Sequence, residues 1–310
     1  MLSRYRDRLA LLVSLGLLVA LFGWLSPGFL STATLGGIAQ RVPTLSLVAT
    51  GMTLVLIVGG IDLSVGSVLA LSGSVIGVLL IDWKLPLGVA GLAGILSGLT
   101  IGALNGMISE SLRVPSFIVT LGTLEASRGL AYLVTNSQTK YLSGKLELLV
   151  RPIGSPMITA AMLLTVAVVI LAQLVLSRAV IGRQMIAIGT NEQATRLAGI
   201  ATRPVKVIVF ATSGALAGLA AVCQLARLGA SDPNAGSGLE LSAIAAAVIG
   251  GTSLNGGRGS VLATFLGVLI IATLEAGLAQ IGASEPVKRV VTGAVIVAAV
   301  VSDTWRRKER

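Results

Sequence analysis

Long apolar runs separated by short polar stretches dominate the chain. A helix of about 20 apolar residues crosses the hydrocarbon core of a bilayer, and many of these runs reach that length. We therefore predict an all-α membrane protein, formed by a single transmembrane domain over residues 1–310. About ten spans fit the pattern, near 9–26, 42–60, 64–81, 87–108, 114–134, 157–177, 204–226, 240–254, 259–281 and 286–302.

The longest polar interruption after residue 160 is residues 182–200, which read GRQMIAIGTNEQATRLAGI. Thr190 stands three residues before Gln193, a capping-box spacing that predicts a helix starting near Asn191. Gly199 is a plausible stop for it. A helix of about two turns does not persist alone in water. The segment is therefore either a solvated loop or a docking element for a soluble partner.

Two stretches of the chain echo each other. Residues 59–70 read GGIDLSVGSVLA, and residues 250–263 read GGTSLNGGRGSVLA. Repeated helices interrupted by glycine often line the path of transporters, although a chain rich in Gly, Ala, Val and Leu can also produce such a match by chance. Asp62 is either a gate residue of such a path or, with Ser64, a cap for the following helix.

Three further features lie within predicted spans. Glu125 and Arg128 are three residues apart, so we expect them to pair on one helix face, with contact to a substrate as the alternative. Glu275 has no basic residue nearby in the sequence, and we expect it to face the interior of the bundle. Glycines at spacings of three or four predict a small-residue face for close helix packing, formed by Gly91, Gly94, Gly98, Gly102 and Gly106.

Composition supports the membrane class. Charged residues are 12% of the 310, hydrophobic residues 54%, and the mean hydropathy is +0.93, whereas soluble domains average about 25% charged residues. The net charge of +10 with only 4% aromatics does not indicate nucleic acid, because the basic residues lie between apolar runs. With both termini inside, the inner segments hold most Lys and Arg, which places residues 182–200 in the cytoplasm.

The chain offers little chemistry of its own. It has no histidine and one cysteine, Cys223, inside a span, so we expect no catalytic residues, no metal site and no bound cofactor. The glycine-rich stretch 250–260 lacks the lysine of a phosphate-binding loop. The energy for transport must then come from another chain or an ion gradient. The apolar run Leu9–Leu25 exceeds a signal-peptide core, and we expect it to remain as the first span.

Three stretches together resemble the permease subunits of bacterial ABC sugar importers of the ribose/xylose/arabinose/galactose type, with the ribose branch nearest. They are residues 51–73, 182–200 and 240–260, and the resemblance extends over nearly the whole chain. It implies the ABC importer permease fold in the bacterial inner membrane. It also implies a second permease copy or a paralogue, a periplasmic sugar-binding protein, and a cytoplasmic ATP-binding subunit with two fused nucleotide-binding domains that hydrolyses ATP.

The resemblance also assigns roles to residues. The cytoplasmic loop 178–206 corresponds to a coupling element for the ATPase, with candidate contacts Arg183, Ile186, Gly189, Asn191, Ala194, Arg196, Leu197 and Gly199. The candidates for the transport path or gate are Gly60, Asp62, Ser64, Gly66, Ser67, Thr252, Ser253 and Asn255. We expect Ser, Thr, Asn and Gly rather than charges along the path, because a neutral sugar needs hydrogen bonds and room.

Two questions stay open at this point. The first is the identity of the cargo. Ser242 stands where ribose-type relatives often carry an acidic residue, which weakens a choice of ribose over another small sugar or a related furanosyl signalling molecule. The alternative function is a secondary transporter or channel driven by an ion gradient. Such a protein would need a membrane-embedded carboxylate, for which Asp62 and Glu275 are the candidates.

Overall fold

The computed structural model describes residues 2–142 and 144–308. Helices account for most of these residues, and two strands of two residues each complete the secondary structure. In chain order the elements are α1 Leu2–Leu25, α2 Thr32–Ile57, α3 Val65–Ile81, α4 Leu87–Leu112, α5 Ser116–Thr135, β1 Lys140–Tyr141, α6 Glu147–Val150, α7 Ala160–Arg178, α8 Val180–Thr190, α9 Glu192–Leu197, α10 Thr202–Leu228, β2 Ala230–Ser231, α11 Leu239–Ile249, α12 Val261–Gln280 and α13 Glu285–Lys308.

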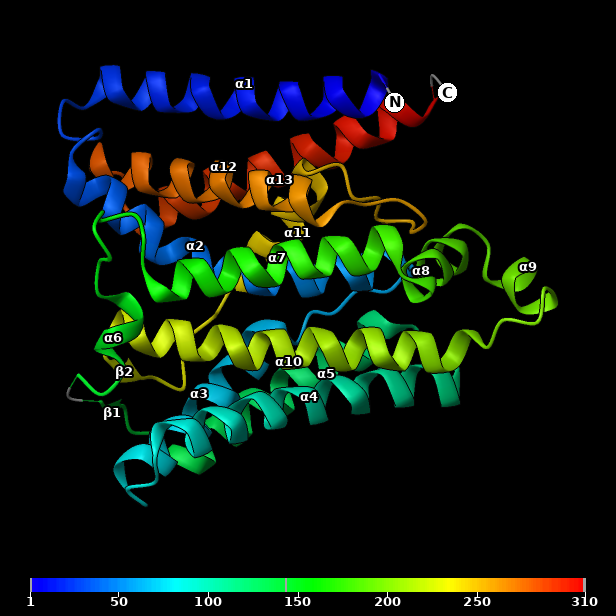
Figure 1. Cartoon of the computed structure of the whole chain (residues 1–310), viewed down its shortest axis with the longest axis horizontal. Coiled ribbons are helices and arrows are strands. Elements are labelled where there is room, and N and C mark those ends of the chain that lie inside the picture. The colour runs from blue at the N-terminus through cyan, green and yellow to red at the C-terminus, as the bar shows by residue number, and fades with distance from the viewer. Residues whose placement is uncertain (1, 143, 309–310) are drawn as a thin grey trace.

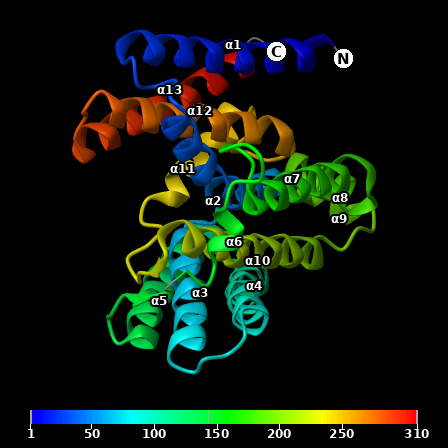
Figure 2. The ribbon, with the colours of Figure 1, turned by 60° about the vertical axis from the view of Figure 1, so that its left-hand side comes forward.

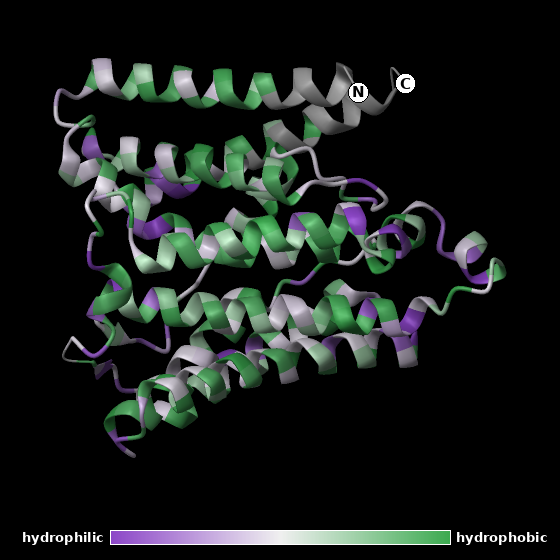
Figure 3. Cartoon of the chain, viewed as in Figure 1, coloured by the Kyte–Doolittle hydropathy of each residue, from purple (hydrophilic) through white to green (hydrophobic). Residues whose placement is uncertain are grey.

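The architecture is that of an all-α membrane protein, as predicted. Among the described residues, six helices are long and apolar enough to cross a membrane: α2, α4, α5, α7, α10 and α12. They run along the long axis of the molecule (Figure 1), and their ribbons are largely hydrophobic (Figure 3). The 11-residue α11 rises only about 16 Å, about half of a hydrocarbon core. The predicted span 240–254 is therefore not one membrane-crossing helix, and the number of crossings stays a prediction.

Helix α2 forms the centre of the molecule. Its side chains are buried without a break from Val42 to Ile57, as expected for a helix that is hydrophobic all round. It packs on α7, α10, α11 and α12, and in Figure 2 it lies between α1, α12 and α13 on one side and α3, α4 and α5 on the other. The helix begins at Thr32, ten residues before the predicted span, because the exposed Arg41 interrupts the apolar run but not the helix.

The glycine face predicted on α4 packs against α10. A Cβ on Gly98 would lie 2.2 Å from the backbone oxygen of Gly214, and one on Gly102 would lie 2.2 Å from that of Phe210. Gly94 and Gly106 also make contacts closer than a Cβ would allow, whereas Gly91 faces open space. The prediction of close helix packing is thus confirmed: Gly98, Gly102 and Gly106 pack on α10, and Gly94 packs on Ile76 of α3.

Gly98→Leu is expected to lower the free energy of unfolding by roughly 1–3 kcal/mol or more, because overpacking against a backbone atom cannot be relieved by a rotamer change. The matched control is Gly91→Leu on the same helix, which should leave stability within about 0.5 kcal/mol. The melting temperature of the purified protein in detergent measures both. Equal melting temperatures for the two variants would contradict the observed packing.

The two ends of the molecule differ. At one end β1 pairs with β2 in antiparallel fashion, Lys140 opposite Ser231, and Lys140 forms an ion pair with Asp82 at 2.8 Å. At the other end lie α8 and α9, together with the start of α1 and the end of α13 (Figure 1). Both chain termini therefore share a side with the predicted coupling segment.

Candidate functional site

The predicted docking segment contains two helices rather than one. Helix α8 was not predicted as an element. It buries Gly182, Met185 and Ile188, and Met185 and Ile188 lie in an apolar cluster with Val55 and Leu176. The spacing of three between these buried residues was the signal that the sequence offered. Most of residues 178–206 is thus helical, and α9 projects from the end of the molecule (Figure 1).

The cap of α9 differs from the predicted one. The side-chain oxygen of Asn191 accepts a hydrogen bond from the Ala194 N–H at 2.9 Å, so Asn191 is the N-cap. Thr190 belongs to the last turn of α8, where its hydroxyl donates to the Ile186 carbonyl at 2.7 Å. The prediction of a capping box formed by Thr190 and Gln193 is therefore wrong. The predicted stop is confirmed, because α9 ends at Leu197 and Gly199 follows with φ +83°.

The docking candidates lie mostly at the surface. Leu197, at the end of α9, is 84% exposed and is among the most exposed large hydrophobic residues described. The other surface candidates are Arg183, Ile186, Asn191, Ala194, Arg196 and Gly199. Gly189 is the exception, since it lies against the backbone of Ile57 and Gly257. An exposed leucine on a short projecting helix is a feature that a partner protein can cover.

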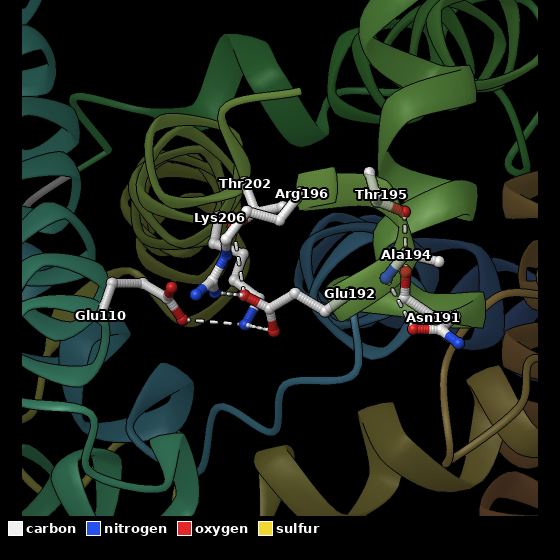
Figure 4. A network of polar contacts seen from close by, with 8 residues as sticks. All are labelled: Glu110, Asn191, Glu192, Ala194, Thr195, Arg196, Thr202 and Lys206. Carbon is white, nitrogen blue, oxygen red and sulfur yellow. Dashed lines mark hydrogen bonds and ion pairs between the residues drawn. The ribbon is translucent and has the colours of Figure 1, made fainter. Parts of the chain in front are cut away.

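A polar network connects α9 to the bundle (Figure 4). Lys206 Nζ lies 2.6 Å from Glu192 Oε2 and 2.9 Å from Glu110 Oε1. Glu192 Oε1 also accepts hydrogen bonds from Arg196 at 2.9 Å and from the Thr202 hydroxyl at 3.1 Å. Through these contacts α9 is joined to the end of α4 and the start of α10. Glu110 and Lys206 are 96 residues apart, and no sequence pattern paired them.

The network keeps Glu192 ionised. Partial burial opposes ionisation, but the hydrogen bond and positive charge of Lys206, with the bonds from Thr202 and Arg196, outweigh it. The pKa of Glu192 therefore lies below its ordinary value. Beside the network is a cavity of about 460 Å³, lined by charged side chains of both signs, among them Glu110, Arg113, Glu192, Arg203 and Lys206.

Asp62 lies in the turn between α2 and α3 and is buried. Its Oδ1 accepts hydrogen bonds from the backbone N–H of Ser64 at 3.0 Å and its hydroxyl at 2.6 Å, and its Oδ2 accepts one from Ser213 at 3.2 Å. Asn105 Nδ2 donates to the Ser64 hydroxyl at 2.9 Å. Ser64 is the N-cap of α3 but makes no side-chain capping bond. The carboxylate thus orders the turn and attaches it to α4 and α10.

A second meeting point, which we call the glycine junction, is formed by Ile57, Gly189 and Gly257. The Gly257 N–H donates to the Ile57 carbonyl at 2.9 Å. A Cβ on Gly189 would lie 1.8 Å from that same carbonyl oxygen and 2.4 Å from the Gly257 nitrogen. Here α8 contacts the end of α2 and the turn before α12, backbone against backbone. The predicted coupling segment therefore touches the end of the helix that precedes the first echoed turn and, through Gly257, the second echoed turn itself.

The predicted path residues do not form one cluster. Thr252 and Ser253 are buried in the turn that contributes Gly257, whereas Asn255 in that turn is exposed. Gly66 lies elsewhere, in the first turn of α3, where a Cβ would be 2.4 Å from both the Gly236 oxygen and Glu240 Oε2. Ser67 is buried beside it, and Gly60, in the turn that follows α2, borders the charged cavity.

The expected pair of Glu125 with Arg128 is wrong. Arg128 Nη1 instead donates to the backbone oxygens of Pro233 at 2.6 Å and Ala235 at 2.8 Å. Within residues 2–142 and 144–308, Glu125 makes no hydrogen bond or ion pair, and its side chain is exposed. A separation of three residues allows Glu125 and Arg128 to pair, but the Arg128 guanidinium instead donates hydrogen bonds to backbone carbonyls of the segment before α11.

Comparison with known proteins gives consistent matches along the chain. The family model of the permease component of branched-chain amino acid transport systems matches residues 34–300. The ribose import permease protein RbsC of Escherichia coli (strain K12) is 39% identical over 304 residues, covering 96% of this chain and 93% of the relative. From the same organism, the D-allose permease AlsC is 35% identical (96% and 91% covered) and the L-arabinose permease AraH 32% (99% and 94%).

Proposed function

The chain belongs to the family of permease components of branched-chain amino acid transport systems, and from its relatives within that family we infer its function. It is a membrane-spanning permease subunit of an ABC importer for a small sugar, in the bacterial inner membrane, and it is a transport component rather than an enzyme. The family description mentions amino acids, but the relatives matched over nearly the full chain are named for sugars. Those full-length matches are the observation on which the function rests.

The cargo we propose is a ribose-like monosaccharide. The support is the 39% identity to a ribose permease, which exceeds the 35% to an allose permease and the 32% to an arabinose permease. The three sugars are all small and neutral and carry several hydroxyls. Selection among them by this chain would depend on a few hydrogen-bonding side chains along the path.

The assembly we propose has a second permease copy or a paralogue, a periplasmic sugar-binding protein, and a cytoplasmic ATP-binding subunit with two fused nucleotide-binding domains. Helix α9 is its docking element for that subunit, with the exposed Leu197 as the central contact. Both termini are then cytoplasmic, because they lie at the same end as α9 (Figure 1). ATP is bound and hydrolysed by the partner subunit, and this chain needs no cofactor.

We also propose about ten membrane crossings and an internal repeat. The repeat is supported by the way α2 and α11 end. Gly59 N–H donates to Leu56 O at 2.9 Å, and Gly251 N–H donates to Val248 O at 2.8 Å. Both glycines have positive φ, +79° and +81°, a region that glycine enters without steric cost. The sequence echo aligns Gly59 with Gly250 rather than with Gly251. The two helix ends therefore match each other in conformation, at a position shifted by one residue from the sequence alignment.

Two connections can transmit movement from α9 to the bundle. One is the network of Glu192, Lys206 and Glu110, which reaches α4 and α10. The other is the glycine junction, through which α8 contacts the end of α2 and the turn before α12. Closure of the ATPase shifts the permease between inward and outward states only by binding them unequally. The proposed gate consists of the polar turns that carry Gly60, Asp62, Ser64, Thr252, Ser253 and Asn255, together with Gly66 and Ser67 in the first turn of α3.

Reconstitution tests the function directly. The permease is placed in liposomes with the ATPase and the sugar-binding protein encoded beside it, and uptake of labelled D-ribose, D-allose and L-arabinose is measured with and without ATP. We expect ATP-dependent uptake of at least one of the three. Uptake that follows an ion gradient and ignores ATP would instead support the secondary-transporter alternative. Absence of ATP-dependent uptake of all three would contradict the proposed cargo class.

A further inference from the structure

Glu125 lies at the middle of the 20-residue helix α5, about 14 Å from either end. Helix α5 is one of the six helices long and apolar enough to cross a membrane, and only 17% of its most apolar window is buried within the chain. It packs on α3 and touches α4, which leaves its opposite face uncovered (Figure 2). The exposed Glu125 carboxylate therefore stands at mid-depth without a partner in the described part of the chain.

A carboxylate at this depth does not suit contact with lipid. Ionisable side chains within spans almost always face the protein interior or a water-filled cavity. Gly122 and Gly129 are three and four residues from Glu125 and share its side of the helix. A Cβ on either glycine would meet nothing within 4 Å, in contrast to the glycines of α4 that pack on α10. There is room beside the carboxylate that residues 2–142 and 144–308 leave unfilled.

A second polar feature borders this face. One turn beyond Glu125, Arg128 binds the Pro233 and Ala235 carbonyls of the irregular segment 232–238, which leads into α11. Arg128 precedes the end of α5 by seven residues, about 10 Å along the helix axis, so the carbonyls that it binds lie beside α5 rather than beyond its end. Ser237 and Gly238 in it are exposed. Irregular backbone at membrane depth is tolerated only where protein buries it or where it lines a water-filled cavity.

We propose that this face of α5 lines the sugar path, facing the same helix of a second copy of the chain, and that Glu125 contacts the sugar. The inference rests on the proposed function and extends it to a specificity-determining residue. An ionised carboxylate is an acceptor with two oxygens, so it can take hydrogen bonds from two neighbouring hydroxyls of a monosaccharide. Arg128 keeps further N–H donors beyond those it gives to the two carbonyls. The path then includes charged groups, contrary to the expectation from the sequence.

Thiol labelling tests whether the uncovered face of α5 is accessible to water. Cys223, the sole cysteine, is buried in α10 and is replaced by alanine, so that Glu125→Cys carries one thiol. The complete transporter in liposomes is treated with a charged, membrane-impermeant methanethiosulfonate. The control is Leu171→Cys, near the middle of α7, where Leu171 is 62% exposed. We expect Glu125→Cys to react at least tenfold faster. Equal rates would show that Glu125 faces lipid, and would overturn the proposal.

Uptake tests the contact with sugar. In the complete transporter, Glu125→Leu should lower sugar uptake per ATP hydrolysed at least tenfold, using whichever of D-ribose, D-allose and L-arabinose the unaltered protein takes up fastest. Glu125→Gln, which keeps one acceptor, should lose less than threefold. The amount of assembled transporter is measured in parallel, so that a loss of assembly is distinguished from a loss of the sugar contact. Unchanged uptake by Glu125→Leu would overturn the contact. If the unaltered transporter takes up none of the three sugars, the proposed function fails. The thiol-labelling rates then still decide whether this face of α5 is exposed to water.

Discussion

Gly189→Val is expected to reduce ATP-driven sugar uptake to less than a tenth of the unaltered rate. A Cβ at this position would lie 1.8 Å from the Ile57 carbonyl oxygen and 2.4 Å from the Gly257 nitrogen. Both are backbone atoms, so no side-chain rotation relieves the overlap, and α8 must move away from the ends of α2 and of the turn before α12. Because α8 leads directly into α9, the proposed docking helix should move with it.

The measurement is ATP-dependent uptake in liposomes, compared with Gly37→Val in α2. Gly37 has nothing within 4 Å of the added Cβ, so its substitution changes the same residue type without a collision. If Gly189→Val does not assemble, Gly189→Ala adds only a Cβ methyl group at the same point. It should still lower uptake more than Gly37→Ala does. Normal uptake by the assembled Gly189→Val variant would show that the glycine junction does not transmit movement.

The helices were predictable because their signals are local. Apolar runs of membrane length gave the all-α class, and regular spacing put the glycines of α4 on one face. The partner of that face was not predictable, since the contact of Gly98 with Gly214 joins residues more than a hundred positions apart. The same limit applies to the network of Glu110 and Lys206, which depends on how α4 and α10 cross.

The errors have a common physical origin. Glu125 and Arg128 had the right spacing to pair, but the backbone carbonyls of Pro233 and Ala235, distant in sequence, bind the guanidinium. Thr190 had the right spacing for a capping box, but α8 extends far enough to include it and Asn191 takes the cap. In each case the local rule was sound, and a tertiary contact or a neighbouring helix offered a competing partner.

The proposed docking role of α9 leads to the second large effect. Leu197→Asp is expected to weaken binding of the ATPase subunit about 100-fold or more. Burial of a leucine side chain stabilises an interface by about 1.5–3 kcal/mol, and each 1.4 kcal/mol corresponds to tenfold in affinity. An unpaired carboxylate in the same contact adds a desolvation cost. Leu197 is a sharper probe than Arg196, because Arg196 also pairs with Glu192 and its replacement would disturb the polar network.

Leu148→Asp is the matched control, since Leu148 is 79% exposed and lies on α6, at the end of the molecule opposite α9 (Figure 1). Binding of the purified ATPase subunit to the permease in nanodiscs measures both variants, and Leu148→Asp should bind as the unaltered protein does. The pair of substitutions separates a general effect of surface charge from an effect of the docking site. If Leu197→Asp binds the ATPase normally, α9 is not the contact, and the two connections that lead from it into the bundle lose their proposed role in transport.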